Sequence, residues 1–233
     1  MNRFLAALFT LLTLAGCSTR SLSEYATSGV NATLAALDTG GTTTVSMTLN
    51  DPSSSLIFLQ LTSDDSLEAT DGTASQPLGE SSELGYVSYS AAFLVDQGTF
   101  TVTLKRKKDA GAPNSVVTLP PAFTLTPPSS TTQSRAMPMS FTWTPASADP
   151  MTVTFAGSCL QSFTSNIPTG STQFTLPAGG LQKAAASGNQ TVPDSCSATA
   201  TVTRERAGTL DPAFHGGAAN AGQVRAFDFT TAP

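Results

Sequence analysis

Apolar and polar residues alternate along much of the chain beyond residue 42, and a period of two predicts β-strands. The segment Val45–Leu49 alternates Val, Met and Leu with Ser and Thr, as expected for a strand with one buried face. The segment Leu56–Leu61 is apolar on both faces, which predicts a central strand. Asp51-Pro52-Ser53-Ser54 lies between the two segments and predicts the turn that joins them.

Similar short runs follow, each bounded by turn residues. In the first half of the chain they are Leu67–Thr70, Thr73–Ser75, Tyr86–Val95, Thr99–Lys105 and Ser115–Thr126. Asp71-Gly72 is a hairpin signal between the first two runs. Pro120-Pro121 predict that the last run is an edge or bulged strand, because proline donates no hydrogen bond to a sheet. About seven short strands separated by frequent turns are typical of a β-sandwich.

The strand pattern restarts after a proline-rich polar segment, Pro127–Thr132, which predicts a linker over residues 127–136. The runs beyond the linker are Met139–Thr144, Met151–Ala156, Thr172–Leu176, Ser197–Arg204 and Gln223–Thr230. The layout of Val45–Leu61 matches that of Met139–Phe155, which indicates an internal repeat. We therefore predict an all-β fold with two tandem β-sandwiches, over residues 42–126 and 137–233.

Two short motifs support this architecture by resemblance. Asp96–Val102 resembles the D-x-G-x-Y-x-C stretch that leads into strand F of immunoglobulin-like domains, although Phe100 replaces the tyrosine and Val102 replaces the cysteine. Ser140–Pro145 resembles strand B of fibronectin type III domains, whose tryptophan, here Trp143, fills the core. The resemblance implies tandem immunoglobulin-like or fibronectin-like sandwiches. It implies no activity, because this fold carries many unrelated functions.

The N-terminus contains an apolar run, Phe4–Ala15, behind a single cation, Arg3. At about 12 residues, the run is too short to span a bilayer as a helix but suits the core of a signal peptide. The run ends in Leu14-Ala15-Gly16-Cys17, which resembles the lipobox of bacterial lipoproteins. The resemblance implies that residues 1–16 are removed and that Cys17 is acylated on its thiol and its new amine. An ordinary secretory signal and a membrane helix are the alternatives.

The lipobox resemblance also implies a location. We expect a protein of the bacterial cell envelope whose membrane partner is the bilayer that holds its N-terminal lipid. Ser18 follows the cysteine, which resembles the sorting pattern of outer-membrane lipoproteins. Residues 17–41 are mostly small and polar, so we predict a lipidated cysteine followed by a flexible tether.

Charge and cysteine content narrow the partner and the chemistry. The chain has 11 Lys and Arg against 16 Asp and Glu, whereas a nucleic-acid binder would show a basic face. With Cys17 assigned to lipid, Cys159 and Cys196 remain, and in an exported protein such a pair most often forms a disulfide. A metal site or a reactive thiol is the alternative, but the sequence has no C-x-x-C motif.

The sequence offers little for catalysis. His215 is the only histidine, and Asp211 lies four residues before it, close enough in a loop for contact. A zinc site needs further ligands, and a serine triad needs a base oriented by a carboxylate. The chain also lacks the G-x-S-x-G, H-E-x-x-H and Walker motifs. We predict a protein that is not an enzyme and uses no cofactor.

Two charged clusters are weaker candidates for a site. The carboxylates Asp64, Asp65, Glu68 and Asp71 could supply oxygens to calcium, but their spacing does not match the D-x-[DN]-x-[DN]-G loop. A solubilising loop and hairpin is the alternative.

The run Lys105-Arg106-Lys107-Lys108 is a candidate site for anions such as lipid phosphates or an acidic glycan. Strand alternation would place Lys105 and Lys107 on one face and Arg106 and Lys108 on the other. A charged strand end that keeps the hairpin soluble is the alternative.

These observations favour a non-catalytic, membrane-anchored envelope lipoprotein that acts as a spacer or as a binding or adhesion module. Its expected partner is an envelope protein or a glycan. An envelope hydrolase with paired carboxylates, similar to glycosidases, is one alternative, and a calcium-binding module is another.

Overall fold

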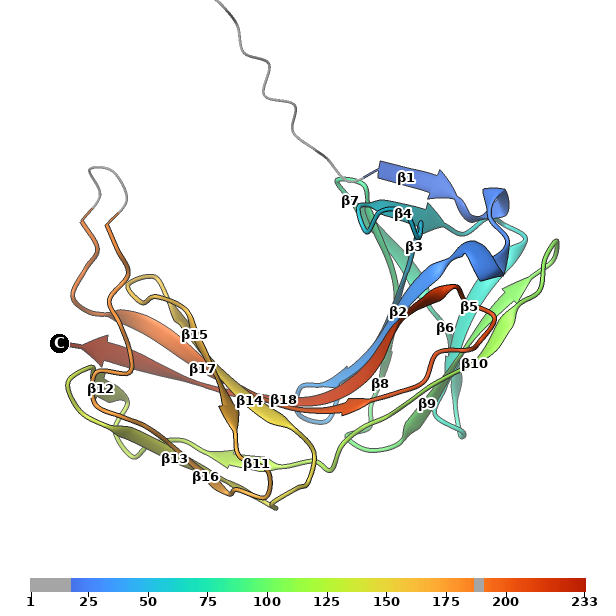
Figure 1. Ribbon diagram of the computed structural model, residues 1–233. Coiled ribbons are helices and arrows are strands. Elements are labelled where there is room, and N and C mark those ends of the chain that lie inside the picture. The colour runs from blue at the N-terminus through green and yellow to red at the C-terminus, as the bar shows by residue number, and fades with distance from the viewer. Residues whose placement is uncertain (1–17, 187–190) are drawn as a thin grey trace, which may run out of the picture.

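The computed structural model describes residues 18–186 and 191–233, and these residues form an all-β structure (Figure 1). They contain eighteen strands, the short 3-10 helices η1 (Leu22–Glu24) and η2 (Thr27–Gly29), and no α-helix. Neither described helix is long and apolar enough to cross a membrane. The predicted signal peptide and Cys17 lie outside the described residues. The predicted all-β fold class is confirmed.

An eleven-stranded sheet, called here the long sheet, forms the frame of the molecule. Its main path runs through β1 (Ser18–Ser21), β4 (Ile57–Gln60), β3 (Thr43–Asn50), β2 (Asn31–Asp38), β18 (Gly216–Ala232), β17 (Cys196–Ala207), β14 (Met151–Gly157) and β15 (Phe163–Ile167). Three more strands join it, with β8 (Tyr86–Phe93) beside β3, β7 (Gly79–Glu83) beside β8 and β12 (Thr132–Ser134) beside β18.

Two smaller sheets complete the structure. The four-stranded sheet has the order β10 (Ala112–Thr118), β9 (Thr99–Arg106), β5 (Asp65–Thr70) and β6 (Ser75–Pro77). The three-stranded sheet has the order β11 (Thr124–Thr126), β13 (Met139–Thr144) and β16 (Gln173–Leu176). The hairpin predicted at Asp71-Gly72 is confirmed, because β5 and β6 pair across it from Thr70 to Ser75.

Two separate hydrophobic cores give the predicted pair of sandwiches. The N-terminal core lies between the long sheet and the four-stranded sheet, and it includes Phe100 and Val102 of β9. The C-terminal core lies between the long sheet and the three-stranded sheet. Trp143 is buried in this second core, as the fibronectin resemblance implies. Each core arises from apolar residues at alternate strand positions, which point to one face of a sheet.

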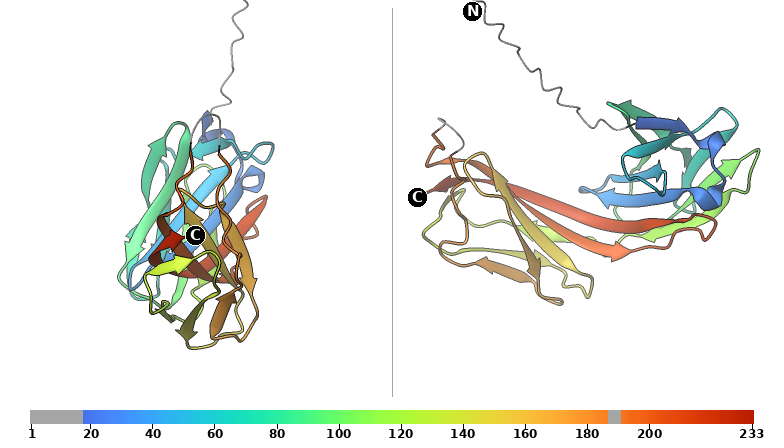
Figure 2. Two further views of the ribbon diagram at one scale, coloured as in Figure 1. Left: turned by 90° about the vertical axis from the view of Figure 1, so that its left-hand side faces the viewer. Right: turned by 45° about the horizontal axis from the view of Figure 1, so that its top comes forward.

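The strand β18 belongs to both sandwiches. Its first half pairs in parallel with β2, from Gly216 opposite Asn31 to Gln223 opposite Asp38. It also pairs antiparallel with β17 over residues 220–231 and in parallel with β12 at its end. In Figure 2 the long strands β17 and β18, coloured orange and red, run from one sandwich to the other.

The shared strand corrects the expected division of the chain at residues 127–136. Phe214, Ala219 and Ala221 follow the expected linker but lie in the N-terminal core. The expected linker itself contains β12. The sequence did not reveal this arrangement because residues 216–222 are mostly Gly and Ala, whose weak hydrophobic contrast hides a period of two.

The expected flexible tether over residues 17–41 is wrong for its described part. Residues 18–38 form β1, η1, η2 and β2 instead, and the inward side chains Val30, Ala32, Leu34 and Ala36 are fully buried. Small Ala and Thr residues made this alternation look like a polar linker. Parallel pairing with β18, nearly 190 residues away in sequence, supplies the hydrogen bonds that a tether would have left to water.

Two smaller expectations also change. The segment Leu56–Leu61 was expected to be central, but β4 lies between the edge strand β1 and the end of β3, which it meets at a single residue pair. The internal repeat is similar only in sequence layout. Strands β3 and β4 share one sheet, whereas β13 and β14 lie in opposite sheets of the C-terminal sandwich.

Candidate functional site

One face of the long sheet is left uncovered by the two smaller sheets, and we call it the outer face. It lies on the concave side of the curved long sheet in Figure 1. On β14 and β17 the covered positions, such as Val153 and Val202, are buried, while the residues between them point outward. Outward hydroxyl residues include Thr33, Thr44, Ser46 and Ser90 at one end and Thr152, Thr154, Thr199, Thr201 and Thr203 at the other.

The outer face is regular and carries little charge. Thr154 of β14 lies between Thr164 of β15 and Thr201 of β17, and the hydroxyls of Thr154 and Thr164 are 2.9 Å apart. The charged residues at outward positions of β17 and β18 are Glu205 and Asp228, and Asp228 accepts a hydrogen bond from Thr199 at 2.6 Å. Such a face offers donors and acceptors in rows without a strong field.

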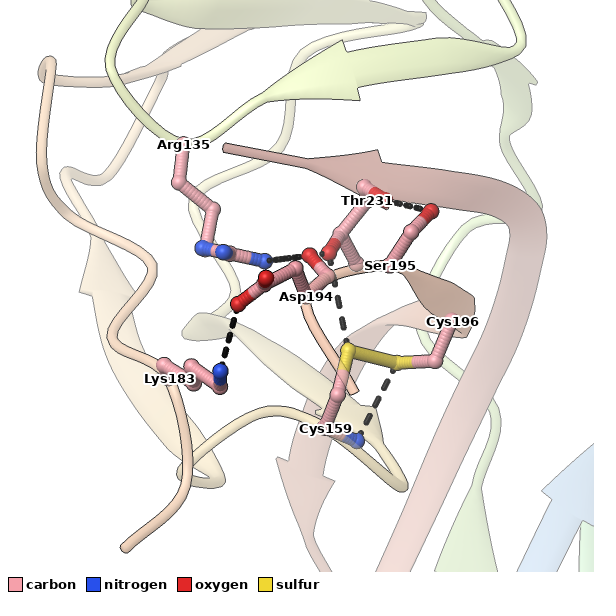
Figure 3. Close-up of a disulfide and its surroundings, with 7 residues drawn as sticks. All are labelled: Arg135, Cys159, Lys183, Asp194, Ser195, Cys196 and Thr231. Carbon is pink, nitrogen blue, oxygen red and sulfur yellow. Dashed lines mark hydrogen bonds and ion pairs between the residues drawn. A yellow bond between two sulfur atoms is a disulfide. The ribbon is translucent and has the colours of Figure 1, made fainter. Parts of the chain in front are cut away.

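The predicted disulfide between Cys159 and Cys196 is confirmed (Figure 3). It joins the loop after β14 to the first residue of β17, with the two Cα atoms 5.8 Å apart. The backbone N–H of Cys159 donates to Sγ of Cys196 at 3.1 Å. Nearby, Arg135 donates to the hydroxyl of Thr231 at 2.9 Å. The bridge therefore ties the loop after β14 to the start of β17 in the C-terminal sandwich.

The run Lys105-Arg106-Lys107-Lys108 does not form a free cationic patch. The side chain of Arg106 is only 2% exposed and donates to the backbone carbonyls of Leu22 and Tyr25. Lys105 pairs with Glu68, and Lys107 and Lys108 both lie near Asp64. The candidate anion site is therefore wrong for Arg106, which anchors the N-terminal segment to the end of β9.

The carboxylates proposed as weak calcium ligands are also engaged separately. Asp65 lies 3.4 Å from Arg106, and Asp71 accepts hydrogen bonds from the backbone of Thr73 and Ala74 within its own turn. With Asp64 and Glu68 paired to lysines, the four groups do not converge. Within residues 18–186 and 191–233, no group of three or more His, Cys, Asp or Glu side chains is arranged to hold a metal ion.

His215 is exposed, and its Nδ1 lies 3.1 Å from the side-chain oxygen of Asn31. The spacing in sequence would allow a contact with Asp211, but a solvated loop histidine is the favoured interpretation, and the side chain of His215 is directed to Asn31. Asp211 is buried and accepts hydrogen bonds from the backbone of Asn114 and Ala213 instead. The chain's only histidine thus sits beside an amide at the start of β18, without a carboxylate to orient it.

No local motif marks the most polar part of the interior, which we call the joint. The joint comprises Arg204, Arg206, Gln223 and Arg225, at covered positions of β17 and β18 between the two cores. Arg204 is fully buried and donates to the carbonyls of Pro121 and Pro145, each at 2.7 Å. Its guanidinium also lies 4.8 Å from the ring centre of Phe123.

The other joint residues are paired as well. Arg206 contacts both oxygens of Asp149, at 2.9 and 2.8 Å, and this pairing holds the pKa of Asp149 below its usual range. Arg225 pairs with the buried Asp38 at 2.8 Å. The pKa of Arg204 is lowered, because the effect of burial exceeds the opposing effect of the nearby Asp149 carboxylate. These contacts fasten the segment that connects the cores onto the long sheet.

A pocket of about 420 Å³ opens beside the joint. Asp96, Phe123, Thr144 and Arg225 contribute to its lining. The guanidinium of Arg225 is already occupied by Asp38 and by Gln223, whose side-chain oxygen it reaches at 3.0 Å. The charged side chain of Arg225 in the pocket lining is therefore engaged within the joint.

The N-terminal segment is held by a carboxylate. Asp51 accepts hydrogen bonds from the Ser53 hydroxyl at 2.6 Å and from the Tyr25 hydroxyl at 2.7 Å. These bonds lower the pKa of Asp51 to about 2. Arg20 donates to Tyr25 at 2.9 Å, so β1 and the helix that follows it are tied to the turn before β4.

Apolar side chains gather at the edge where β1 begins, and we call Leu56, Leu84 and Tyr86 the apolar tip. The backbone N–H of Ser18 donates to the carbonyl of Leu56 at 3.0 Å. Thr19 donates to the carbonyl of Gly85, in the turn between β7 and β8, at 3.4 Å. All three side chains of the apolar tip are exposed. No local motif marks the tip, because its residues come from two separate segments, the turn before β4 and the β7–β8 hairpin.

Comparison with known proteins gives no family. No protein-family model matches the chain, and no curated protein matches it. Among solved structures, the BSP domain of a biofilm-associated protein is similar over 88% of this chain and 30% of its own, with 15% identity and a TM-score of 0.25. The Yersinia pseudotuberculosis adhesin InvE is similar over 88% of this chain and 59% of its own, with 11% identity and a TM-score of 0.25.

A segment of two fibronectin type III domains from chicken tenascin is also similar. The similar region covers 84% of this chain and 95% of the tenascin segment, with 10% identity and a TM-score of 0.24. This chain spans less than two thirds of the length of the first two matched structures. Similarity at this level carries no information about function.

Proposed function

We propose that the protein is a bacterial envelope lipoprotein, anchored through Cys17, whose fused sandwiches act as a non-catalytic binding module. The outer face of the long sheet is the proposed binding surface. Its proposed partner is an envelope protein or a glycan. Both carry hydrogen-bonding groups that could pair with the hydroxyls of the nearly uncharged outer face.

The motif Leu14-Ala15-Gly16-Cys17 supports the anchor. Three acyl chains hold a protein at a membrane far more firmly than a single chain, which binds only marginally. In the structure β1 starts at Ser18, directly after the proposed lipid-bearing residue. A protein anchored in this way would be held close to the bilayer and not on a long tether.

The observation that carries the binding proposal is the shared strand β18. It joins both sandwiches into one sheet, so the hydroxyl residues near its two ends lie on one continuous outer face. Two sandwiches on a flexible linker could not hold their surfaces in a fixed relation. The joint adds rigidity, because Arg206 and Arg204 donate to the carbonyls of Leu119 and Pro121 in the segment that leads from one core to the other.

The anchor is tested by replacing the acylated residue. Cys17→Ser should leave a precursor of full length that is missing from the membrane fraction, whereas the natural protein should be shortened and membrane-bound. Immunoblots of fractionated cells measure both properties. Normal processing and membrane retention of Cys17→Ser would contradict the anchor.

The binding surface is tested by placing charge on the outer face. Intact lipidated protein is used to capture partners from envelope extracts, and the captured material is identified by mass spectrometry and glycan analysis. Thr154→Lys with Thr201→Lys should reduce capture, because two ammonium groups would disrupt neighbouring hydroxyl rows.

A matched control is Thr101→Lys, which changes a partly exposed threonine of β9 in the four-stranded sheet. This control should capture the same partners as the unchanged protein. Equal loss of capture in both variants, or unchanged capture in the outer-face variant, would argue against the outer face as the binding surface.

A further inference from the structure

We propose that the apolar tip, formed by Leu56, Leu84 and Tyr86, contacts the bilayer and sets how the sandwiches stand on the membrane. The occupant of this surface is the lipid of the membrane that holds the protein. The inference rests on the proposed acylation of Cys17, and its test separates the two.

Hydrogen bonds place the apolar tip around the residue that follows the anchor. Ser18 bonds to Leu56, and Thr19 bonds to the turn Leu84-Gly85. Tyr86 follows that turn, and its ring lies 4.8 Å from the ring of Phe58, which faces the N-terminal core. Because Cys17 precedes Ser18 directly in the chain, acyl groups on Cys17 and the apolar tip would have to meet the same membrane surface.

The turn at Leu84 is unusual in its choice of residue. The two strands are paired up to Glu83 and Tyr86, so Leu84 and Gly85 alone form the turn. Both residues have positive φ, at 50° and 82°, and Leu84 is the one residue other than glycine with positive φ among the described residues. Turns of this kind favour Asn-Gly, because these residues adopt left-handed conformations at little cost. Leu84 bears that cost and is 97% exposed.

The composition of the apolar tip fits a membrane interface. Leucine side chains enter the boundary between headgroups and acyl chains, and tyrosine is enriched there because its ring is apolar and its hydroxyl is polar. The charged neighbours are Glu83, which pairs across from Tyr86, and Arg20, which is bound to Asp51. A negative carboxylate beside the tip gives no attraction to anionic lipid, so contact should occur with neutral phosphatidylcholine.

The test uses mature, lipidated protein in phosphatidylcholine vesicles made with or without brominated acyl chains, which quench tryptophan fluorescence on contact. Leu84→Trp places a reporter on the tip. Leu94→Trp is the matched control, because Leu94 is 86% exposed and lies just beyond the opposite end of β8. The single natural tryptophan, Trp143, is buried in the C-terminal core and gives a constant background.

We expect brominated lipid to reduce the emission added at position 84 by about twofold, since interfacial side chains lie within the reach of acyl-chain quenchers. Emission added at position 94 should not change. Flotation of the vesicles through a density gradient is measured on the same samples to report the anchor.

The possible outcomes separate the two proposals. Protein that floats with the vesicles but shows no quenching at position 84 would overturn the apolar tip and leave the anchor standing. Equal quenching at positions 84 and 94 would also overturn it, because contact would then not be confined to the tip. Protein that does not float with the vesicles would overturn the anchor. The inference about the tip would then fall as well, because it rests on the anchor.

Discussion

The two cores share a sheet but are built differently. Among the described residues, the N-terminal core has 25 buried apolar residues, of which five are aromatic, whereas the C-terminal core has 17, of which six are aromatic. In the smaller core Phe141 lies within 6 Å of the rings of Trp143, Phe174 and Phe227. It also contains the disulfide. The C-terminal core thus has fewer buried residues, but its larger aromatic side chains and its disulfide compensate for the smaller number.

The joint shows how one sheet can support both cores. Along the covered side of β18, Ala219 and Ala221 give way to Gln223 and Arg225, and then to Phe227. A continuous apolar stripe would have merged the cores or left hydrophobic surface exposed between them. Polar side chains paired with carbonyls and carboxylates separate the cores without breaking the sheet.

The largest expected effect concerns the aromatic cluster. Phe141→Ala should destabilise the protein by about 3–5 kcal/mol, because it removes a buried ring and leaves a cavity. Urea unfolding followed by far-UV circular dichroism measures the loss. Phe163→Ala, at a ring 37% exposed on the edge strand β15, should cost far less. An equal cost for both would mean that the aromatic cluster does not hold the C-terminal core.

The disulfide should come second. Replacing both Cys159 and Cys196 by Ser should destabilise the protein by about 2–4 kcal/mol, since the unfolded chain regains the entropy of an open loop of 37 residues. Hydrogen exchange should locate the loss in β14, β15 and the start of β17. Loss spread evenly over the N-terminal core would instead show that the cores unfold as one unit.

The joint should have an intermediate effect. Arg204→Met keeps much of the side-chain volume but leaves the carbonyls of Pro121 and Pro145 without their donor, at a cost of about 1–3 kcal/mol. Urea unfolding is followed by fluorescence and by circular dichroism. An unchanged m-value and coincident unfolding curves would show that the two cores still unfold together. Arg206→Met is the control at a partly exposed position, and a larger loss there would contradict the role of Arg204.

Asp51 should make the stability of the N-terminal sandwich depend on pH. Its pKa in the folded protein is about 2, below the usual 3.8, so the carboxylate stabilises the fold above about pH 4. That contribution should disappear as the pH falls from about 4 to about 2. The gap in urea midpoint between the natural protein and Asp51→Asn should therefore be widest near neutral pH and close in acid. A constant gap would contradict the role of the charge.

The smallest effect should be a gain. Leu84→Asn places a residue suited to the left-handed region in the β7–β8 turn, and should raise stability by about 0.5–1 kcal/mol. Thermal unfolding measures the shift. In vesicles the same change should weaken contact at the apolar tip, so a more stable but less membrane-engaged protein is expected. A loss of stability would show that Leu84 is packed in the folded state.

Sequence reasoning was reliable where hydrophobic contrast is strong. Thr99–Lys105, Met139–Thr144 and Met151–Ala156 each contain large apolar residues at every second position, and each is a strand of the structure. The disulfide followed from elimination among three cysteines. Long-range pairing was beyond reach, because nothing in Asn31–Asp38 alone indicates that Gly216–Gln223 will lie beside it.

The candidate sites were harder to predict because they depend on tertiary partners. A run of cations in sequence suggested an exposed patch, yet Arg106 is buried against carbonyls that come from residues 22 and 25. The joint and the apolar tip each combine residues from distant segments, and no local motif marks them. Only the fold brings Ser18, Leu56 and Leu84 to one edge.

The order of strands along the chain has a consequence for biogenesis. β18 follows every other described strand in the sequence, yet it supplies Ala219 and Ala221 to one core and Phe227 and Phe229 to the other. While the chain is being made, β2 has no parallel neighbour until residues 216–223 are available. Neither core can therefore be completed early, and both sandwiches depend on the same late strand for closure.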